Sequence, residues 1–416
     1  MHKSAEAPYS FNSREGRKGI IMRIAYLAQA YPPMISGAAL FAQWIAEAMA
    51  QRGYPVLVIA ASDREHTYCT QNGNLTILRL HSLHNPMRIG QRFLINPRRL
   101  VMKALGDFHP EIIHTHDPLQ LSLLGIEYAK RAGIPIILTV HQLPWFLASY
   151  LPTFLRAGTE GVLWMYARWL AHNKFTSVIT PSQSIAHLVK RMTGLSTEMI
   201  PFGLDLQRFH PLLSSDEESS TRRKWNMPLH VPILLHVGRL DTDKRVDRVI
   251  HAVARPVHET DAHVLIVGDG TRKPALIKLC KSLGISDRVH FLGYVSIQDG
   301  LPEIYRIANL FVTASEIEIQ SLAMLAAAAS GLPIVAVRAT SNHEIVHHGI
   351  NGYLAESGDL NGLSHAISLL LRDPQKANSM GRSSLILVAN QTLNHTSEAH
   401  ERFYRRLIWQ LRTQKE

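Results

Sequence analysis

The residues with the clearest chemistry follow short apolar runs, where strands of an α/β protein would end. The run His236-Val-Gly-Arg-Leu-Asp-Thr-Asp-Lys-Arg245 places Arg239 and Lys244 in a short loop before a predicted helix. Two cations beside a helix N-terminus suit a diphosphate, because their charges and the free backbone N–H groups both favour an anion. On a basic protein the same pair is also typical of ordinary surface charge. A phosphate site and surface charge are therefore both open interpretations of this loop.

A second polar loop lies between the predicted strand that ends at Thr313 and a helix of small residues. Glu318 stands in it, and the backbone amides of Gln320, Ser321 and Leu322 follow. This arrangement could bind sugar hydroxyls and phosphate together. A helix cap explains the acidic residue equally well, because glutamate is favourable near a helix N-terminus.

Three histidines and several glycines are the remaining candidates. His114 and His116 alternate along one predicted strand and so point the same way, and His141 ends the next strand. These histidines fit either a metal pair or hydrogen-bonding residues at strand ends. Gly37 lies in the first strand–helix turn, where the lack of a side chain lets the backbone approach a ligand. The segment Gly268-Asp269-Gly270 is a weaker signal of the same kind.

The elements that position these loops read as continuous apolar strands separated by amphipathic helices. That pattern predicts parallel sheets covered by helices on both faces. Helices are predicted over 38–52, 121–131 and 396–412. The predicted strands cover 23–28, 55–61, 75–80, 112–116, 134–140, 178–180 and 198–201, and then 233–237, 263–267, 289–292, 310–313, 334–337 and 353–355.

The strand–helix rhythm stops and restarts once, which predicts two domains. The polar stretch 211–223 reads as a loop-like hinge between an N-terminal Rossmann-like domain, 22–205, and a C-terminal one, 206–395. Residues 1–21 are predicted to be a disordered tail. The segment 145–175 breaks the rhythm and is expected to be a helical excursion over the site.

Composition limits the partners. The chain has 416 residues and a formal net charge of +11, which favours anionic partners. Its Lys and Arg residues are dispersed and no known nucleic-acid motif occurs, so we expect no nucleic acid. One cluster, Arg88, Arg92, Arg98, Arg99 and Lys103, fits either a solvated helix face or a patch that binds an anionic membrane surface.

Cysteine use and hydropathy bear on the compartment. The two cysteines, Cys69 and Cys280, lack metal-ligand spacing, so no zinc site is expected and a reducing cytoplasm is favoured. No secretory signal and no apolar run long enough for a transmembrane helix is recognised. We therefore expect a cytoplasmic protein, with peripheral attachment to the inner face of the membrane as a further hypothesis.

The set and order of the motifs resemble retaining glycosyltransferase family 4, whose fold is GT-B, with two Rossmann-like domains facing across a cleft. The resemblance runs from about Met22 to the C-terminus. The matching segments are YPPMISG, IIHTHDP, TVHQ, ITPSQS, IPFGLDLQRFHP, HVGRLDTDKR, LIVGDG, VHFLGYV, the Glu318 loop, SGLPIVA and HHGINGYL.

The resemblance implies a role for each matching residue. Arg239 and Lys244 match the pair that grips the donor diphosphate, and Gly37 matches the glycine that approaches it from the other domain. Glu318 matches an acid near the sugar, and His116 the histidine that faces the reacting sugar and the acceptor. The amides of Gln320, Ser321 and Leu322 match the turn that cradles the donor, and the backbone at Val295 matches the contact to the base. The helix 396–416 would pack back on the first domain.

These roles imply transfer of a sugar from a nucleotide-diphosphate-sugar to an acceptor hydroxyl with retention. No metal or other cofactor is expected, because Arg and Lys take the metal's place in stabilising the leaving diphosphate. Three segments resemble those of transferases that act on lipids. They are the Glu-Ile-Gln-Ser-Leu variant at Glu318, the aromatic-rich stretch after His141 and the basic cluster. A lipid or lipid-linked acceptor is therefore one expectation.

One position departs from the family pattern. The family's motif has a second glutamate eight residues after the first, and here that position is Ala326. The missing carboxylate normally holds the ribose hydroxyls, so its loss is expected to cost about 1.5–3 kcal/mol of donor affinity. A non-catalytic GT-B protein that binds nucleotide-sugars is the alternative hypothesis.

Overall fold

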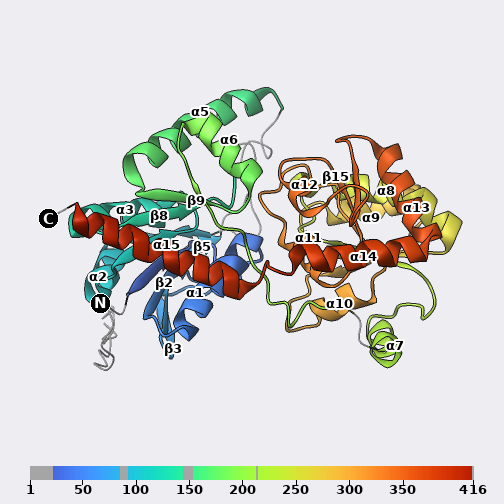
Figure 1. Cartoon of the computed structure of the whole chain (residues 1–416), viewed down its shortest axis with the longest axis horizontal. Helices are drawn as coiled ribbons and strands as arrows, with labels where there is room; N and C mark the ends of the chain where they lie inside the picture. Colours follow the sequence, from blue (N-terminus) through green and yellow to red (C-terminus); the bar gives the residue numbers. More distant parts are fainter. Residues whose placement is uncertain (1–21, 85–91, 144–152, 212–213, 415–416) are drawn as a thin grey trace. The chain divides into compact units, whose positions relative to one another are not determined.

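The computed structural model describes residues 22–84, 92–143, 153–211 and 214–414. The chain forms two compact units, the first of Met1–Leu138 with Glu401–Glu416 and the second of Thr139–His400 (Figure 1). The units divide at Leu138/Thr139 and at His400/Glu401, and not at the domain boundary 205/206 expected from the sequence. The boundary at 205/206 stays a prediction. Part of the reason is that the segment after Thr139 bonds within the second unit: Ser182 Oγ donates to the Ile319 carbonyl over 2.9 Å, and Gln183 N donates to Glu344 over 2.9 Å.

The first unit contains a sheet in the order β8-β7-β1-β2-β4-β3, parallel except for the antiparallel pair β3–β4. The strands are β1 (Ile24–Leu27), β2 (Val56–Ala61), β3 (Tyr68–Asn72), β4 (Leu75–Leu80), β7 (Ile112–Thr115) and β8 (Ile136–Thr139). The helices are α1 (Gly37–Gln51), α2 (Arg98–Phe108) and α3 (Gln120–Ala132). A separate antiparallel hairpin joins β5 (Ser82–His84) to β6 (Arg92–Leu94).

Local chemistry sets the bounds of α1. Ser36 is extended, and its Oγ accepts a bond from Ala39 N over 3.1 Å, which begins the helix. Gly53, at φ 92°, follows its last turn, as predicted from a glycine after a helix. Its inner face buries Phe41, Ile45 and Met49.

The last helix, α15 (Leu393–Thr413), packs on the first unit through its second half, as predicted for the helix that closes the chain. Tyr404 is fully buried there and its hydroxyl lies 3.1 Å from that of Tyr26. At the rim, Glu401 pairs with Arg52 at 2.9 Å. The helix therefore completes the core of the first unit.

The second unit is built on a fully parallel sheet in the order β13-β12-β11-β14-β15-β16. The strands are β11 (Ile233–Val237), β12 (His263–Val267), β13 (Val289–Gly293), β14 (Leu310–Val312), β15 (Ile334–Val337) and β16 (Gly352–Ala355). The helices around it are α8 (Val246–Thr260), α9 (Lys273–Ser282), α10 (Leu301–Ile307), α11 (Leu322–Ala329), α12 (Asn342–Ile345), α13 (Leu360–Arg372) and α14 (Pro374–Val388). Its strand order is that of a doubly wound nucleotide-binding fold.

The second unit also includes α5 (Thr153–Lys174), β9 (Ser177–Thr180), α6 (Gln183–Thr193) and β10 (Glu198–Met199). The predicted excursion over 145–175 is thus helical from Thr153 onward, and residues 144–152 lie outside the described residues.

One predicted loop is a helix. The polar stretch expected to be a hinge contains α7 (Ser215–Lys224). Ser214 caps it by accepting from Glu217 N over 3.2 Å. Its first turn is acidic and its last turn is basic, so both ends complement the helix dipole. Capping and end charges stabilise this helix, which has no apolar face. The sequence prediction relied on an apolar face to recognise helices and therefore missed it.

Candidate active site

The second unit has its topological switch point between β11 and β14. These strands are neighbours in the sheet, although the chain first runs outward through β12 and β13. Ligands of doubly wound folds bind at the carboxyl ends of the strands at such a point. The two loops predicted from sequence, one with Arg239 and Lys244 and one with Glu318, leave these two strand ends. Lys244 Nζ lies 2.6 Å from Glu318 Oε1, so the structure joins the loops directly.

Arg239 lies in the same loop and is held by two carboxylates. Its guanidinium pairs with Asp241 and, at 2.9 Å, with Asp243 Oδ2. The side chains of Arg239 and Lys244 are each 20% exposed. Both cations are thus oriented by carboxylates while part of each faces solvent, and an incoming anion can reach them.

Two glycines let a neighbouring loop support the Arg239 loop. A Cβ on Gly268 would lie 1.9 Å from the Gly238 carbonyl oxygen, and its φ of 134° is left-handed. A Cβ on Gly270 would lie 2.6 Å from the Leu240 backbone. The close approach allows Leu240 N to donate to the Asp269 carbonyl over 2.9 Å. The Gly268-Asp269-Gly270 signal therefore has a packing explanation.

The Glu318 loop is fixed by the loop that follows β15. Glu318 N donates to Thr340 Oγ1 over 2.9 Å, and Ser341 Oγ donates to the Glu318 carbonyl over 3.1 Å. Asn342, fully buried, donates to the Ser315 carbonyl over 3.1 Å. The sequence analysis missed these three supporting residues, because the segment Thr340-Ser341-Asn342 carries no chemical signal apart from its fold.

The predicted donor-cradling turn lies at the start of α11. Ser321 is the N-cap of this helix and its Oγ accepts from Met324 N over 3.4 Å, while Leu322 is the first helical residue. The Gln320 side chain acts structurally, because its Oε1 accepts from Phe202 N over 2.6 Å. Val295, the predicted base contact, follows β13 and is buried. Ala326 is buried within α11.

Another residue that sequence reasoning passed over is His236, near the end of β11. It is 1% exposed, and its Nδ1 donates to the Val312 carbonyl over 2.9 Å. Burial lowers the pKa of His236 from 6.5 to about 4, so the ring is neutral at pH 7. Nε2 then carries a lone pair, and within the described part of the chain this atom has no hydrogen-bond partner. Its place two residues before Gly238, at the end of a predicted strand, was the available signal.

The first unit has its own switch point, between β1 and β7, and it carries Gly37 and His116. The loops after these strands are joined by Gln29 N, which donates to Asp117 Oδ2 over 2.9 Å. Burial raises the pKa of Asp117 to about 6. Gly37 is the first residue of α1.

His116 is buried in an aromatic cluster of the first unit. Its ring stacks on His114 with centroids 4.4 Å apart. His114 Nδ1 lies 2.6 Å from the Tyr404 hydroxyl, which also contacts Tyr26. Burial raises the pKa of Tyr26 and of Tyr404 above the ordinary value, so both hydroxyls are neutral. His141, the third predicted histidine, lies in the second unit and stacks on Phe202 with centroids 5.2 Å apart.

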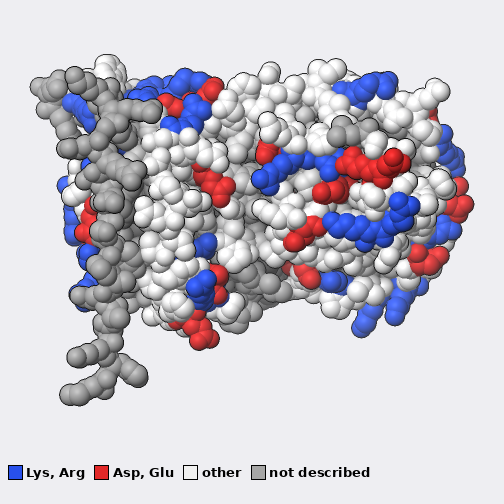
Figure 2. All heavy atoms as spheres, turned by 90° about the horizontal axis from the view of Figure 1, so that it is seen from below, with Lys and Arg blue, Asp and Glu red and all other residues white. Residues whose placement is uncertain are grey.

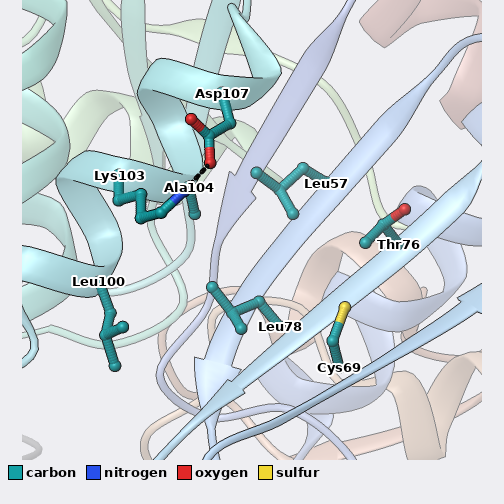
Figure 3. Close-up of a pocket in the computed structure, with 8 residues that line it drawn as sticks. All are labelled: Leu57, Cys69, Thr76, Leu78, Leu100, Lys103, Ala104 and Asp107. Atoms are coloured by element: carbon teal, nitrogen blue, oxygen red, sulfur yellow. Dashed lines mark hydrogen bonds and ion pairs between the residues drawn. The ribbon is translucent and has the colours of Figure 1, made fainter. Parts of the chain in front are cut away.

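The predicted basic cluster is not one surface. Arg92 is buried, and its Nε donates to Ser82 Oγ over 2.7 Å, which makes it a structural residue of the β5–β6 hairpin. Arg98 pairs with Glu127 at 2.6 Å, and Lys103 pairs with Asp107 at 2.6 Å beside a small apolar pocket of the first unit (Figure 3). Arg99 is exposed, and Arg88 lies outside the described residues. Arg92 was therefore wrongly included in an exposed cluster, because charge alone does not reveal burial. For Arg98, Arg99 and Lys103, which are exposed on α2 (Arg98–Phe108), the solvated helix face and the membrane patch both stay predictions.

Three further findings concern the surface charge, metal ligands and membrane-crossing helices. On the face shown in Figure 2, Lys and Arg are interspersed with Asp and Glu. Within the described ranges, no three His, Cys, Asp or Glu side chains converge as metal ligands. None of the helices in those ranges combines the length and apolar character that a membrane crossing needs. The expectations of no metal and no nucleic acid stay predictions.

Comparison with known proteins decides the family. The family model described as Glycosyltransferase Family 4 matches residues 35–208, and that of glycosyl transferases group 1 matches 217–384. The N-acetyl-alpha-D-glucosaminyl L-malate synthase of Bacillus anthracis is 38% identical over 290 residues, which are 65% of this chain and 74% of that protein. The chain belongs to glycosyltransferase family 4.

Two further similarities concern other members and the fold. An alpha-monoglucosyldiacylglycerol synthase of Streptococcus pneumoniae is 26% identical over 76% of this family 4 chain and 71% of its own length. The structure of Anabaena HepE in complex with UDP-glucose superposes with a TM-score of 0.74 at 20% identity, over 92% of this chain and 99% of that one. The predicted GT-B fold with two Rossmann-like domains is thereby confirmed.

Proposed function

We propose that this family 4 protein is a retaining glycosyltransferase that moves a sugar from a nucleotide-diphosphate-sugar to a hydroxyl of a lipid or lipid-linked acceptor. The observation that carries the proposal is the joined pair of loops at the switch point of the second unit, where Lys244 pairs with Glu318 and Arg239 lies in the same loop as Lys244. The structural relative that contains UDP-glucose supports the class of donor.

The chemistry of donor binding follows from the ion pairs. Arg239 and Lys244 exchange part of their contact with Asp243 and Glu318 for phosphate oxygens, whose greater charge makes the new hydrogen bonds stronger. When the sugar–phosphate bond breaks, the two cations stabilise the charge that develops on the leaving diphosphate. Glu318, relieved of Lys244, is then available to the sugar hydroxyls. The N-terminus of α11, with the amides around Ser321, adds further donors for the anion.

Retention is supported by the products named for two relatives. Both names specify alpha products, and an alpha product made from an alpha-linked donor keeps the configuration of the anomeric carbon. The diacylglycerol in the second name supports a lipid acceptor. His116 and Gly37 keep the roles that the family resemblance implies for them.

The decisive experiment is donor turnover. Purified protein is incubated with UDP-glucose, UDP-N-acetylglucosamine or GDP-mannose and with diacylglycerol or a lipid-linked hydroxyl acceptor in mixed micelles, with and without EDTA. We expect nucleoside diphosphate release that depends on one donor and on acceptor, that persists in EDTA, and that yields an alpha product by NMR. An absence of release with every donor, or a beta product, would refute the proposal.

A second candidate function rests on Ala326. Its methyl group is buried in α11 at the position where the family has a carboxylate, which favours a protein that binds nucleotide-sugars without transferring them. Ala326→Glu separates the two candidates. Under the enzyme hypothesis this change preserves or raises turnover and tightens binding of the nucleoside by about 10–100-fold. Under the binding hypothesis both proteins bind nucleotide and neither releases product.

A further inference from the structure

One face of α5 is apolar and exposed. Six large apolar side chains on this helix are between 37% and 82% exposed: Phe154, Leu155, Val162, Met165, Tyr166 and Trp169. At 100° per residue these six fall within an arc of about 120° on the helix. They therefore form one continuous stripe, which we call the α5 stripe.

The opposite side of α5 already provides its packing. Trp164 is buried against Ile185 and Val189 of α6, and Leu170 is also buried. A helix that is apolar on both sides is normally covered on both sides. The α5 stripe is thus not needed to hold the helix on its own unit, and exposed apolar patches of this kind mark interaction sites.

The charges around the α5 stripe indicate what covers it. Between Thr153 and Lys174 the helix has Arg156, Arg168 and Lys174 but only one acid, Glu160. On the adjoining α6, Lys190 and Arg191 are exposed, and that helix has no acidic residue. By the same count Arg168 lies about 40° beyond one edge of the stripe, whereas Arg156 lies about 80° beyond the other edge. A net positive charge on and beside an apolar helix complements anionic lipid headgroups, which attract basic residues while the stripe enters the acyl region.

The aromatic residues of the α5 stripe fit the same environment. Tyr166 and Trp169 stack with ring centroids 6.1 Å apart, and Lys174 Nζ lies 5.0 Å from the Trp169 ring. Tyrosine and tryptophan favour the boundary between headgroups and acyl chains, because each has an apolar body and a polar tip.

We infer that the α5 stripe docks this protein on the surface of an anionic lipid bilayer. The inference rests on the proposed lipid acceptor, and it assigns membrane contact to α5 in place of the predicted cluster around Arg92. A protein whose acceptor lies in a membrane gains from this contact, because transfer then takes place at the surface that contains the acceptor.

The test is co-sedimentation of the full chain with phosphatidylcholine vesicles, with and without phosphatidylglycerol. The stripe variant is Val162→Glu with Met165→Glu, and Ala157→Glu is the matched control, an exposed residue of α5 outside the stripe. We expect wild-type binding to the anionic vesicles, a loss of at least tenfold in the stripe variant, and a change of less than twofold in the control. Circular dichroism and the melting temperature verify that the variants fold, which the exposure of the substituted residues favours.

Three outcomes would overturn the inference: no wild-type binding to anionic vesicles, equal binding of the stripe variant, or a wild-type dimer in light scattering that the stripe variant dissociates. The last outcome would assign the α5 stripe to a second copy of the chain. Nucleoside diphosphate binding is measured on the same samples. Intact vesicle binding without nucleotide binding would refute the proposed function alone, and the reverse result would refute the docking surface alone.

Discussion

Both units carry a switch point at which two loops meet, but the loops are joined by different chemistry. In the second unit the link is an ion pair between Lys244 and Glu318, with Arg239 paired to aspartates beside it. In the first unit the link runs from the Gln29 backbone to Asp117, and the neighbouring His116 belongs to a buried aromatic cluster. The cations of the second unit can therefore form ion pairs with a ligand in place of their carboxylates, whereas the groups of the first unit keep fixed partners.

This difference shows how one type of fold serves two tasks. Ion pairs that are partly exposed can exchange a carboxylate for a phosphate at small cost, because the charge stays compensated throughout. A buried cluster of aromatic rings and hydroxyls cannot exchange partners in this way, since each unsatisfied group would cost about 1–3 kcal/mol. The switch point of the second unit is thus suited to reversible binding of an anion. That of the first unit is suited to holding its side chains in one fixed arrangement.

The largest expected effect tests the neutral His236 beneath the charged loop. Its pKa of about 4 lies below the unfolded value of 6.5, so the unfolded chain binds more protons between these pH values. Stability is therefore complete above pH 6.5 and falls as the pH drops toward 4, by about 3 kcal/mol from this residue. His236→Asn replaces the ring with an amide that does not titrate. Urea denaturation of this variant across the same pH range should show a loss of unfolding free energy that is smaller than in wild type by about that amount. An unchanged pH dependence would mean that His236 is not held neutral.

A smaller effect tests the rigid cluster of the first unit. Tyr404→Phe removes the hydroxyl that contacts both Tyr26 and His114 inside the core. The free energy of unfolding should fall by about 1–2 kcal/mol, and nucleoside diphosphate affinity should stay the same. Urea denaturation measures the free energy of unfolding, and titration calorimetry on the same preparation measures the nucleoside diphosphate affinity. A loss of nucleotide affinity without a loss of stability would contradict the division of tasks between the units.

The smallest effect is expected at the surface. Lys103→Ala breaks the exposed pair with Asp107, which belongs to neither switch point. The free energy of unfolding should change by less than about 0.5 kcal/mol. Vesicle binding should also be unchanged, because the α5 stripe and not the predicted basic cluster contacts lipid. A large loss of vesicle binding would return the membrane contact to the cluster.

The sequence predicted the strands well where they are buried on both faces. The bounds of β11, β12 and β15 were confirmed, because a continuous apolar run flanked by turn residues is typical of a central parallel strand. The bounds of β4 were also confirmed, although this strand includes Thr76 and Arg79 and pairs with the edge strand β3. Strand β3 was missed, since its residues Tyr68–Asn72 are polar and lie at the sheet edge. Helix α7 was missed because caps and end charges form it, with no apolar period.

The places of the candidate site residues at strand ends were predictable from the sequence, but their contacts were not. Strand-end motifs located Arg239, Lys244 and Glu318, because parallel strands present their ligand-binding loops at one edge. That Lys244 pairs with Glu318, 74 residues away, follows only from the strand order. The burial of Arg92 likewise depends on Ser82, ten residues away on the paired strand. Sequence patterns report local periodicity, whereas these contacts are set by topology.

The measurement that tests the central claim most directly is calorimetric titration of UDP and GDP, each beside its nucleoside monophosphate, into wild type, Arg239→Ala and Arg255→Ala. Arg255 is the matched control, because its pair with Glu259 is exposed and lies in the same unit away from the switch point. We predict that one diphosphate binds more tightly than its monophosphate, that Arg239→Ala weakens this diphosphate by about 10–100-fold, and that Arg255→Ala has no effect. Equal binding of the diphosphate by wild type and Arg239→Ala would contradict the assignment of the paired cations to the donor diphosphate.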